Sequence, residues 1–245
     1  MTKGKPPAAL FVAIALAVAA TACEGKKEPE PKAQSAEDTR REAERATRLA
    51  EALKALEAAM PATEQSRQDF ATLRKQAPAR FHADIEELER CPIDGALKAA
   101  VEKRYPHVAG PAVVCMNSMQ ALLTRARATL LSSLLSGKPT TASSQRDDKV
   151  QTALVESAAA THKMATALVG LMIDYGPPDV RLSTFEAIAS TLPPADSRDG
   201  EVPRALLQRS HAGENVKELK EKMAARMKEL AVPLEPAQPS PTPAA

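Results

Sequence analysis

Proline and glycine divide this chain into segments of helical length. Between the breaks, apolar residues recur at spacings of three and four, which is the period of an amphipathic helix. Alanine and leucine dominate the apolar positions and tryptophan is absent, a composition that favours helix over strand. The pattern therefore predicts an all-α fold, a multi-helix bundle with short connections. The breaks lie at Pro61, Pro78, Cys91-Pro92, Gly110-Pro111, 137–139, 176–178 and 193–194.

The first helix is expected to begin near Ala36, because Ser35 and Asp38 have the spacing of a capping box. Its arginine-rich face, residues 40–48, is expected to be solvated. Pro61 suits the first turn of a second helix, since a proline inside a helix removes a hydrogen bond. The apolar stripe of the first helix consists of Leu49, Leu53, Leu56 and Met60.

The middle of the chain carries the strongest helical patterns. Asp94 is placed to cap a helix that extends to Tyr105. The helix that follows Pro111 and reaches Leu135 on its inner face is expected to be the central helix of the core. A second long helix is expected from about Ser143 to Met172.

A last helix is predicted after the loop that reaches Gly200, with Asn215 as its cap. Its apolar residues form a narrow seam flanked by lysines and arginine, so docking onto another protein is an alternative to core packing. The seam is made of Val216, Leu219, Met223, Met227 and Leu230.

The first 25 residues have a different organisation. Lys3 and Lys5 give a basic start, and residues 8–20 form an unbroken apolar run of 13 residues. That length falls within the ~7 to 15 residues of a secretory signal core and below the ~18 that span a bilayer. The run ends in Ala20-Thr21-Ala22-Cys23, and a charged, proline-containing segment follows.

This organisation resembles that of bacterial membrane lipoproteins over residues 1–25, and no family is recognised for the helical domain. The resemblance implies a signal peptide over residues 1–22, diacylglyceryl transfer to Cys23, cleavage before Cys23 and acylation of the new amino terminus. Members of this class usually carry leucine at the position of Ala20. Two alternatives stay open: cleavage near Ala22 that yields a soluble secreted protein, and an uncleaved anchor.

Residues 23–35 are expected to be the lipidated cysteine and a flexible tether, because the segment is too polar to fold alone. Fully extended, the residues after Cys23 reach about 40 Å. Since Glu24 and not aspartate follows the cysteine, the lipoprotein resemblance favours the outer membrane, on its periplasmic face or at the cell surface, over the inner membrane. Residues 36–232 are expected to form one helical domain, and the proline-rich residues 233–245 a disordered tail.

Cys91 and Cys115 are the only thiols left once Cys23 is lipidated. An even pair in an oxidising compartment predicts a disulfide, and the alternative is two separate buried cysteines. Neither belongs to a Cys-x-x-Cys pair, so neither a redox site nor a structural zinc site is predicted.

We predict no catalytic residues, no metal site and no cofactor. His82 and Glu86 could offer two metal ligands, but their i, i+4 spacing is more simply that of an exposed helical pair. Phosphate-binding glycine loops and nucleophile elbows are absent from the sequence. Without the leader the chain carries 31 basic and 31 acidic residues, so it has no net positive field for nucleic acid.

The sequence thus leads to three hypotheses. The first is a lipid-anchored, non-enzymatic envelope protein, held at the membrane by its N-terminal lipid, whose helical domain binds or scaffolds another envelope protein. The second is a helical periplasmic protein that sequesters an apolar small ligand in a cavity between its two longest helices. The third, an envelope hydrolase, lacks any polar cluster that would carry it.

Overall fold

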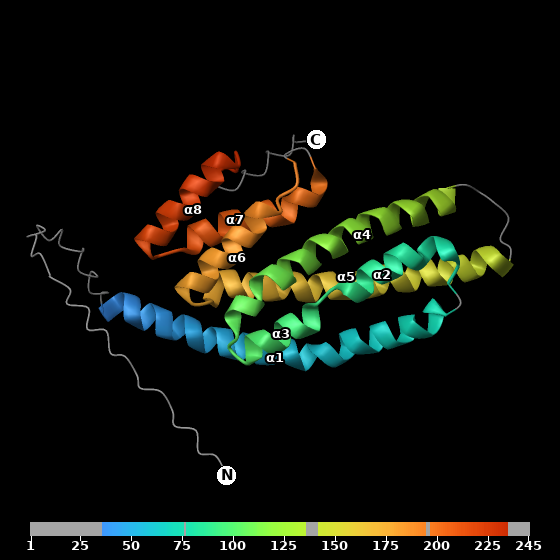
Figure 1. The fold of residues 1–245 in the computed structure, drawn as a ribbon, viewed down its shortest axis with the longest axis horizontal. Coiled ribbons are helices and arrows are strands. Elements are labelled where there is room, and N and C mark those ends of the chain that lie inside the picture. The colour runs from blue at the N-terminus through green and yellow to red at the C-terminus, as the bar shows by residue number, and fades with distance from the viewer. Residues whose placement is uncertain (1–35, 76, 136–141, 195–196, 235–245) are drawn as a thin grey trace, which may run out of the picture. The chain divides into compact units, whose positions relative to one another are not determined.

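The structure, a computed structural model, describes residues 36–75, 77–135, 142–194 and 197–234. Within these ranges the chain is an all-α bundle of several helices, which confirms the predicted fold class (Figure 1). The predicted signal peptide, lipidation site and tether, and the tail from residue 235, lie outside the described residues. The α-helices are α1 (Ala36–Arg74), α2 (His82–Arg90), α3 (Ile93–Val101), α4 (Ala109–Leu135), α5 (Ala142–Tyr175), α6 (Pro178–Ser190), α7 (Glu201–Gly213) and α8 (Lys217–Glu229).

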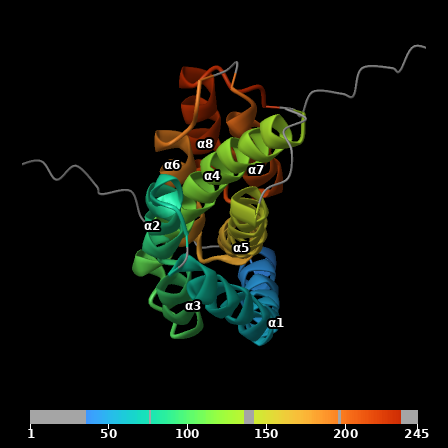
Figure 2. The same ribbon diagram turned by 90° about the vertical axis from the view of Figure 1, so that its right-hand side faces the viewer.

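Helix α5 is the central helix of the bundle. It contacts α1, α2, α3, α4, α6 and α7, and both ribbon views show it running between α1 and α4 (Figures 1 and 2). We expected α4 in this position, and that prediction was wrong. The last turns of α4 face solvent: the exposed fraction is 58% for Leu131 and 77% for Leu135. By contrast, buried side chains recur along α5 from Val150 to Ile173, as a helix enclosed by others requires.

Helix α1 continues through Pro61 for a total of 39 residues, so the predicted second helix after Pro61 does not exist. A proline inside a helix removes one backbone hydrogen bond and favours a kink, and the ribbon of α1 changes direction near its middle (Figure 1). Contacts with α5 along α1 favour the continuous helix. The predicted apolar stripe is confirmed, with Leu49 and Leu53 buried and Leu56 and Met60 packed against the core.

Helix α3 is shorter than expected and has a different cap. It ends at Val101, and Tyr105 lies in a separate 3-10 turn over residues 105–107. Pro92 and not Asp94 occupies the N-cap position. The predicted apolar position of Val101 is 39% exposed at the end of the helix.

Two helices end in a residue with a left-handed backbone. Lys103, with φ of 59°, follows α3, and Ala231, with φ of 53°, follows α8. After α8, Val232 donates its backbone N–H to the carbonyl of Met227 at 2.9 Å, the longer-range bond of a Schellman motif. Arg104 donates in the same way to Ala99 at 2.7 Å after α3. Glycine is the usual residue at both left-handed positions.

The C-terminal part contains a helix that the sequence analysis missed. Helix α7 occupies residues 201–213, with Pro203 in its first turn, where a missing N–H costs little. Helix α8 begins after Val216 and not after an Asn215 cap. It packs against α6 and α7, and its Met223 and Met227 are fully buried. The middle of the α8 seam is therefore packed within this chain, as core packing predicts, and this disfavours the alternative of a docking surface.

A buried arginine joins α1, α6 and the turn between α7 and α8. Arg181 is 1% exposed, and all five N–H groups of its guanidinium have acceptors. Glu214 accepts from Nε at 2.8 Å and from Nη2 at 3.0 Å. Glu42 accepts from Nη1 at 2.8 Å and from Nη2 at 3.0 Å, and the carbonyl of Gly176 takes the last N–H. Two carboxylates thus clamp one guanidinium in the bidentate geometry that favours arginine.

Arg45 of α1 extends this cluster. Its Nη2 donates to the carbonyl of Gly213 at 2.7 Å, and its Nη1 lies 3.3 Å from Glu42. The Arg45 side chain is only 14% exposed, so the expectation that the whole arginine-rich face of α1 is solvated was wrong at this position. The first turns of α1 are thereby fixed to the C-terminal part of the bundle.

The electrostatics of the cluster favour its charged form. Burial alone would raise the pKa of the Glu214 carboxyl, but hydrogen bonds from Arg181 and from the backbone of Val216 outweigh burial and lower that pKa. Burial would likewise lower the pKa of Arg181, and its hydrogen bonds to Glu42 and Glu214 raise the pKa instead. The buried charges are therefore paired and satisfied rather than neutralised.

Candidate functional site

Helices α1, α5 and α7 line a surface groove of about 810 Å³. It lies between the two longest described helices, and α1 has that length because it continues through Pro61. The lining residues are Ala52, Ala55, Leu56 and Ala59 of α1, His162, Lys163, Thr166, Ala167, Gly170, Leu171 and Asp174 of α5, and Val202, Leu206 and Arg209 of α7.

The floor of the groove is apolar and built from small side chains. Ala52, Ala55 and Ala59 follow one another at spacings of three and four, which places them on one face of α1. Ala167 and Gly170 supply the facing part of α5. Small residues on two adjacent helices leave space where larger side chains would fill the gap. The groove therefore follows from the alanine content of these two faces.

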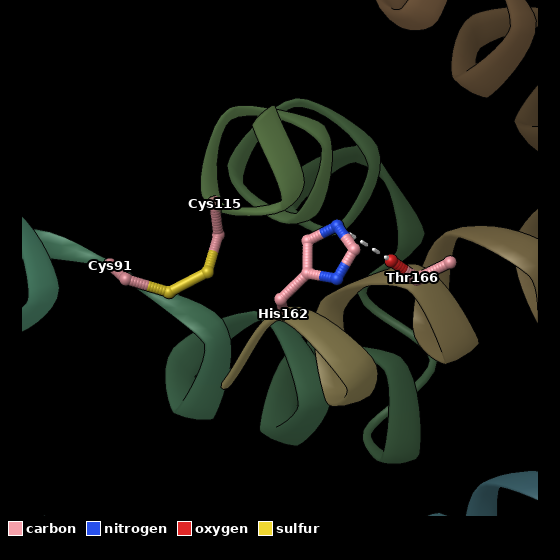
Figure 3. Close-up of a disulfide and its surroundings, with 4 residues drawn as sticks. All are labelled: Cys91, Cys115, His162 and Thr166. Atoms are coloured by element: carbon pink, nitrogen blue, oxygen red, sulfur yellow. Dashed lines mark hydrogen bonds between the residues drawn. A yellow bond between two sulfur atoms is a disulfide. The ribbon is translucent and has the colours of Figure 1, made fainter. Parts of the chain in front are cut away.

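One end of the groove carries His162, Lys163 and Thr166. Nε2 of His162 and the hydroxyl of Thr166 lie 3.5 Å apart in a hydrogen bond, and Figure 3 shows the two side chains pointing toward one another along α5. Burial lowers the pKa of His162, and the charge of Arg127 lowers it further. The imidazole is therefore neutral at pH 7. Lys163 is exposed and makes no ion pair with any described residue.

The other end of the groove carries an ion pair between Asp174 and Arg209, whose charged atoms are 3.1 Å apart. Burial raises the pKa of Asp174, and the charge of Arg209 opposes this rise only in part. The guanidinium lies directly over Gly170, since a Cβ atom at that position would be 2.7 Å from Nη2. Glycine at position 170 thus makes room for the arginine that closes this end.

The groove separates its polar side chains from its apolar floor. Its polar side chains stand at the two ends, and the floor between them offers only apolar contact. In the described part of the chain, no three His, Cys, Asp or Glu side chains are grouped so that they could hold a metal ion. An apolar groove with a few polar groups at its ends is the usual form of a site for an apolar ligand or an amphipathic helix.

The predicted pairing of Cys91 with Cys115 is present. The two residues form a disulfide with a Cα–Cα distance of 5.0 Å, which links the end of α2 to α4 (Figure 3). Cys115 is fully buried. Cys23 lies outside the described residues, so its lipidation stays a prediction.

The predicted pair of His82 and Glu86 has other partners. Glu86 accepts a hydrogen bond from Arg90 at 2.8 Å, and the ring of His82 lies 3.3 Å from the carbonyl of Ala77. Both contacts are exposed. Both side chains are exposed as expected, but the expected ion pair between them is not formed, because each has another partner.

Of the groove residues, Leu56 was predicted as an apolar position of the first helix, but none was predicted to line a binding site. The alanine spacing on α1 was a usable signal, but alanine is so frequent in this chain that the spacing alone does not distinguish a groove from a packed face. Burial of Arg181 was also not predicted. It stands four residues before Phe185 and seven before Ile188, in register with the buried face of α6, and this register could have identified it.

Comparisons with known protein families, with curated proteins and with solved structures found no match to this chain. Across the described residues, none of the helices combines the length and the apolar character needed to cross a membrane.

Proposed function

We propose that this protein is a lipid-anchored envelope protein, and that its helical domain is a non-enzymatic module whose groove binds a helix of another envelope protein. The observation that carries this proposal is the apolar, small-residue floor between α1, α5 and α7. The anchor is Cys23, on the strength of the apolar run and Ala20-Thr21-Ala22 before it. The outer membrane is the favoured location, because Glu24 follows the cysteine.

A helix suits the groove because small residues allow helix axes to approach to about 8–10 Å. An amphipathic helix would place its apolar face on the floor and its polar face toward solvent. The cations at the ends, Lys163 and Arg209, favour acidic residues at the flanks of that apolar face, and only Arg209 is already paired. The partner is therefore expected to present a helix with an apolar stripe and acidic borders.

The size of the groove also supports an alternative, an apolar small ligand. Its volume of about 810 Å³ falls in the range of roughly 300–1,000 Å³ that is usual for small-molecule sites. In this alternative the protein sequesters the ligand and has no protein partner at this surface.

Site-specific photo-crosslinking in the native host separates the two. A photoreactive residue at Ala55 or at Ala167 should crosslink to one discrete protein, whereas the same residue at Ala43, an exposed position of α1 outside the groove, should not. Equal crosslinking from all three positions would overturn the proposed groove. A small molecule retained in the native mass spectrum of purified protein, together with no groove-specific crosslink, would establish the alternative.

The anchor is tested separately by the intact mass of detergent-extracted protein beside Cys23→Ser. We expect the mature chain to begin at Cys23 and to carry added acyl mass. This added mass should be absent from Cys23→Ser. A mature chain without added mass would make this a soluble secreted protein, and the groove would then have to act without a membrane tether.

A further inference from the structure

A second cavity, of about 410 Å³, lies between α1 and the turn that follows α3. Its lining residues are Ala46, Ala50, Leu53, Lys54, Glu57, Val101, Lys103 and Tyr105. At 3.6 residues per turn, the residues that α1 contributes here lie on roughly the opposite side of the helix from Ala52, Ala55 and Ala59. The cavity is therefore separate from the groove, and its use does not depend on acylation of Cys23.

The cavity has an apolar wall. Leu53 is 5% exposed and forms its buried part, and Ala46 and Ala50 continue the same face of α1 toward the N-terminus. Val101 faces it from the end of α3 and keeps 39% of its surface exposed. This wall offers contact to an alkyl chain or to a similar apolar group.

Three polar side chains of the cavity have no hydrogen-bond or ion-pair partner among the described residues. Lys54 and Lys103 make no ion pair or hydrogen bond with any described residue, and the hydroxyl of Tyr105 has no partner among those residues. Burial raises the pKa of Tyr105, which keeps its hydroxyl available as a donor. Glu57 is the one carboxylate among the lining residues. Two ammonium groups and one carboxylate leave a net charge of one positive unit.

The backbone conformation of Lys103 is unusual for a lysine. Its φ of 59° is left-handed, where a residue other than glycine costs about 1–2 kcal/mol. Such a position at the end of a helix is normally filled by glycine, and the chain places a lysine there whose side chain lines the cavity. Ala231 has the same conformation at a helix end outside this cavity, so the case for a binding site rests on the lining charges and the apolar wall.

We propose that this cavity binds a monoanionic amphiphile, with its carboxylate or phosphodiester head at Lys54, Lys103 and Tyr105. Its apolar chain would lie over Leu53 and Val101. A single negative charge matches the net charge of the lining side chains, and Glu57 disfavours a second one. A free fatty acid and a phospholipid both carry this chemistry.

The intrinsic fluorescence of the protein gives a direct measurement. The chain has no tryptophan and only two tyrosines, so Tyr175→Phe leaves Tyr105 as the sole emitter, inside the cavity. Dodecanoate should change this emission saturably, and dodecyltrimethylammonium and dodecyl maltoside should bind at least about tenfold more weakly. Equal response to the anionic, cationic and neutral probes would overturn the proposal. A monomeric short-chain phosphatidylglycerol, titrated in parallel, shows by its relative affinity whether a fatty acid or a phospholipid is preferred.

Lysine variants give the decisive comparison. Lys103→Gly should raise Tm by about 2 °C, because it relieves the left-handed strain, and should weaken dodecanoate binding about tenfold through loss of one charged contact. Lys54→Met should weaken binding to a similar extent. Lys98→Met, an exposed lysine of α3 outside the cavity, is the matched control and should bind as the parent does. Parental affinity in both Lys103→Gly and Lys54→Met would refute the site.

Discussion

Arg181 and Glu214 face each other inside the protein, with both side chains 1% exposed and joined by hydrogen bonds of 2.8 and 3.0 Å. A pair this deeply buried is stable only when each charge keeps its partner, because an isolated buried charge has neither water nor a counter-ion. Glu42 and Gly176 complete the shell around the guanidinium. Loss of one member therefore leaves the other buried charges without a partner. An exposed ion pair on a helix surface does not have this cost, because water solvates the remaining charge.

Arg181→Met is expected to lower the free energy of unfolding by about 3–5 kcal/mol, since it leaves two carboxylates without their guanidinium. Urea-induced unfolding followed by circular dichroism measures this loss. Arg40→Met is the control, because Arg40 pairs with Glu44 while its side chain is 73% exposed. It should change stability by less than about 1 kcal/mol. Similar losses in the two variants would show that burial of the Arg181 pair contributes nothing.

The lowered pKa of Glu214 makes the free energy of unfolding depend on pH in acid. The folded-state pKa lies below the ordinary value of 4.5, so the unfolded chain takes up this proton first. The stabilising contribution of Glu214 is therefore complete above about pH 5 and is lost as the pH falls through the folded-state pKa. The free energy of unfolding of the parent protein should fall more steeply below pH 5 than that of Glu214→Gln. If the free energy of unfolding had the same pH dependence in the parent and in Glu214→Gln, the lowered pKa of Glu214 would be contradicted.

Reduction of the Cys91–Cys115 disulfide is expected to cost about 3.5 kcal/mol, because the bond closes a loop of 24 residues in the unfolded chain. Thermal unfolding with and without a reductant should show a lower Tm for the reduced protein. Cys91→Ala/Cys115→Ala should reproduce that Tm and be insensitive to the reductant. If the double variant kept the Tm of the oxidised protein, the disulfide would have no stabilising role.

Ala231→Gly is expected to stabilise the protein by about 0.5–1 kcal/mol. The left-handed φ of 53° at this position costs an alanine more than a glycine, and the gain is partly offset by the greater freedom of glycine in the unfolded chain. The side chain of Ala231 is exposed, so no packing is lost. Chemical denaturation measures the change, and Ala225→Gly inside α8 should act in the opposite direction, by roughly 1 kcal/mol.

The helical class of the fold could be predicted because apolar periodicity and helix breakers act locally. Leu49 and Leu53 on α1, and Met223 and Met227 on α8, are buried as their spacing indicates. Pro61 shows the limit of such local signals. A proline breaks a helix only when the lost hydrogen bond outweighs the contacts that the continued helix makes. Helix α1 as a whole packs against α5, which lies far along the chain.

A cavity between the two longest helices was a hypothesis from the sequence, but the helices that line the two observed cavities could not be predicted. The groove requires the small residues of α1 and α5 to face each other, and the sequence does not state which helices become neighbours. Arg181 illustrates the same difficulty, because its acceptors Glu42 and Glu214 are 139 and 33 residues away. The disulfide could be predicted because only two thiols, those of Cys91 and Cys115, remained to pair. This inference needs no knowledge of which helices are neighbours.

The Arg181 cluster also determines where this protein resists a mechanical load. Glu42 lies only six residues beyond the first residue of α1, about 9 Å along the helix. Tension applied at the N-terminal end of α1 therefore meets Arg181 within two helical turns and passes into α6 and the α7–α8 turn. A molecule held by its N-terminus would bear strain across the core of the bundle and would not simply peel away its first helix.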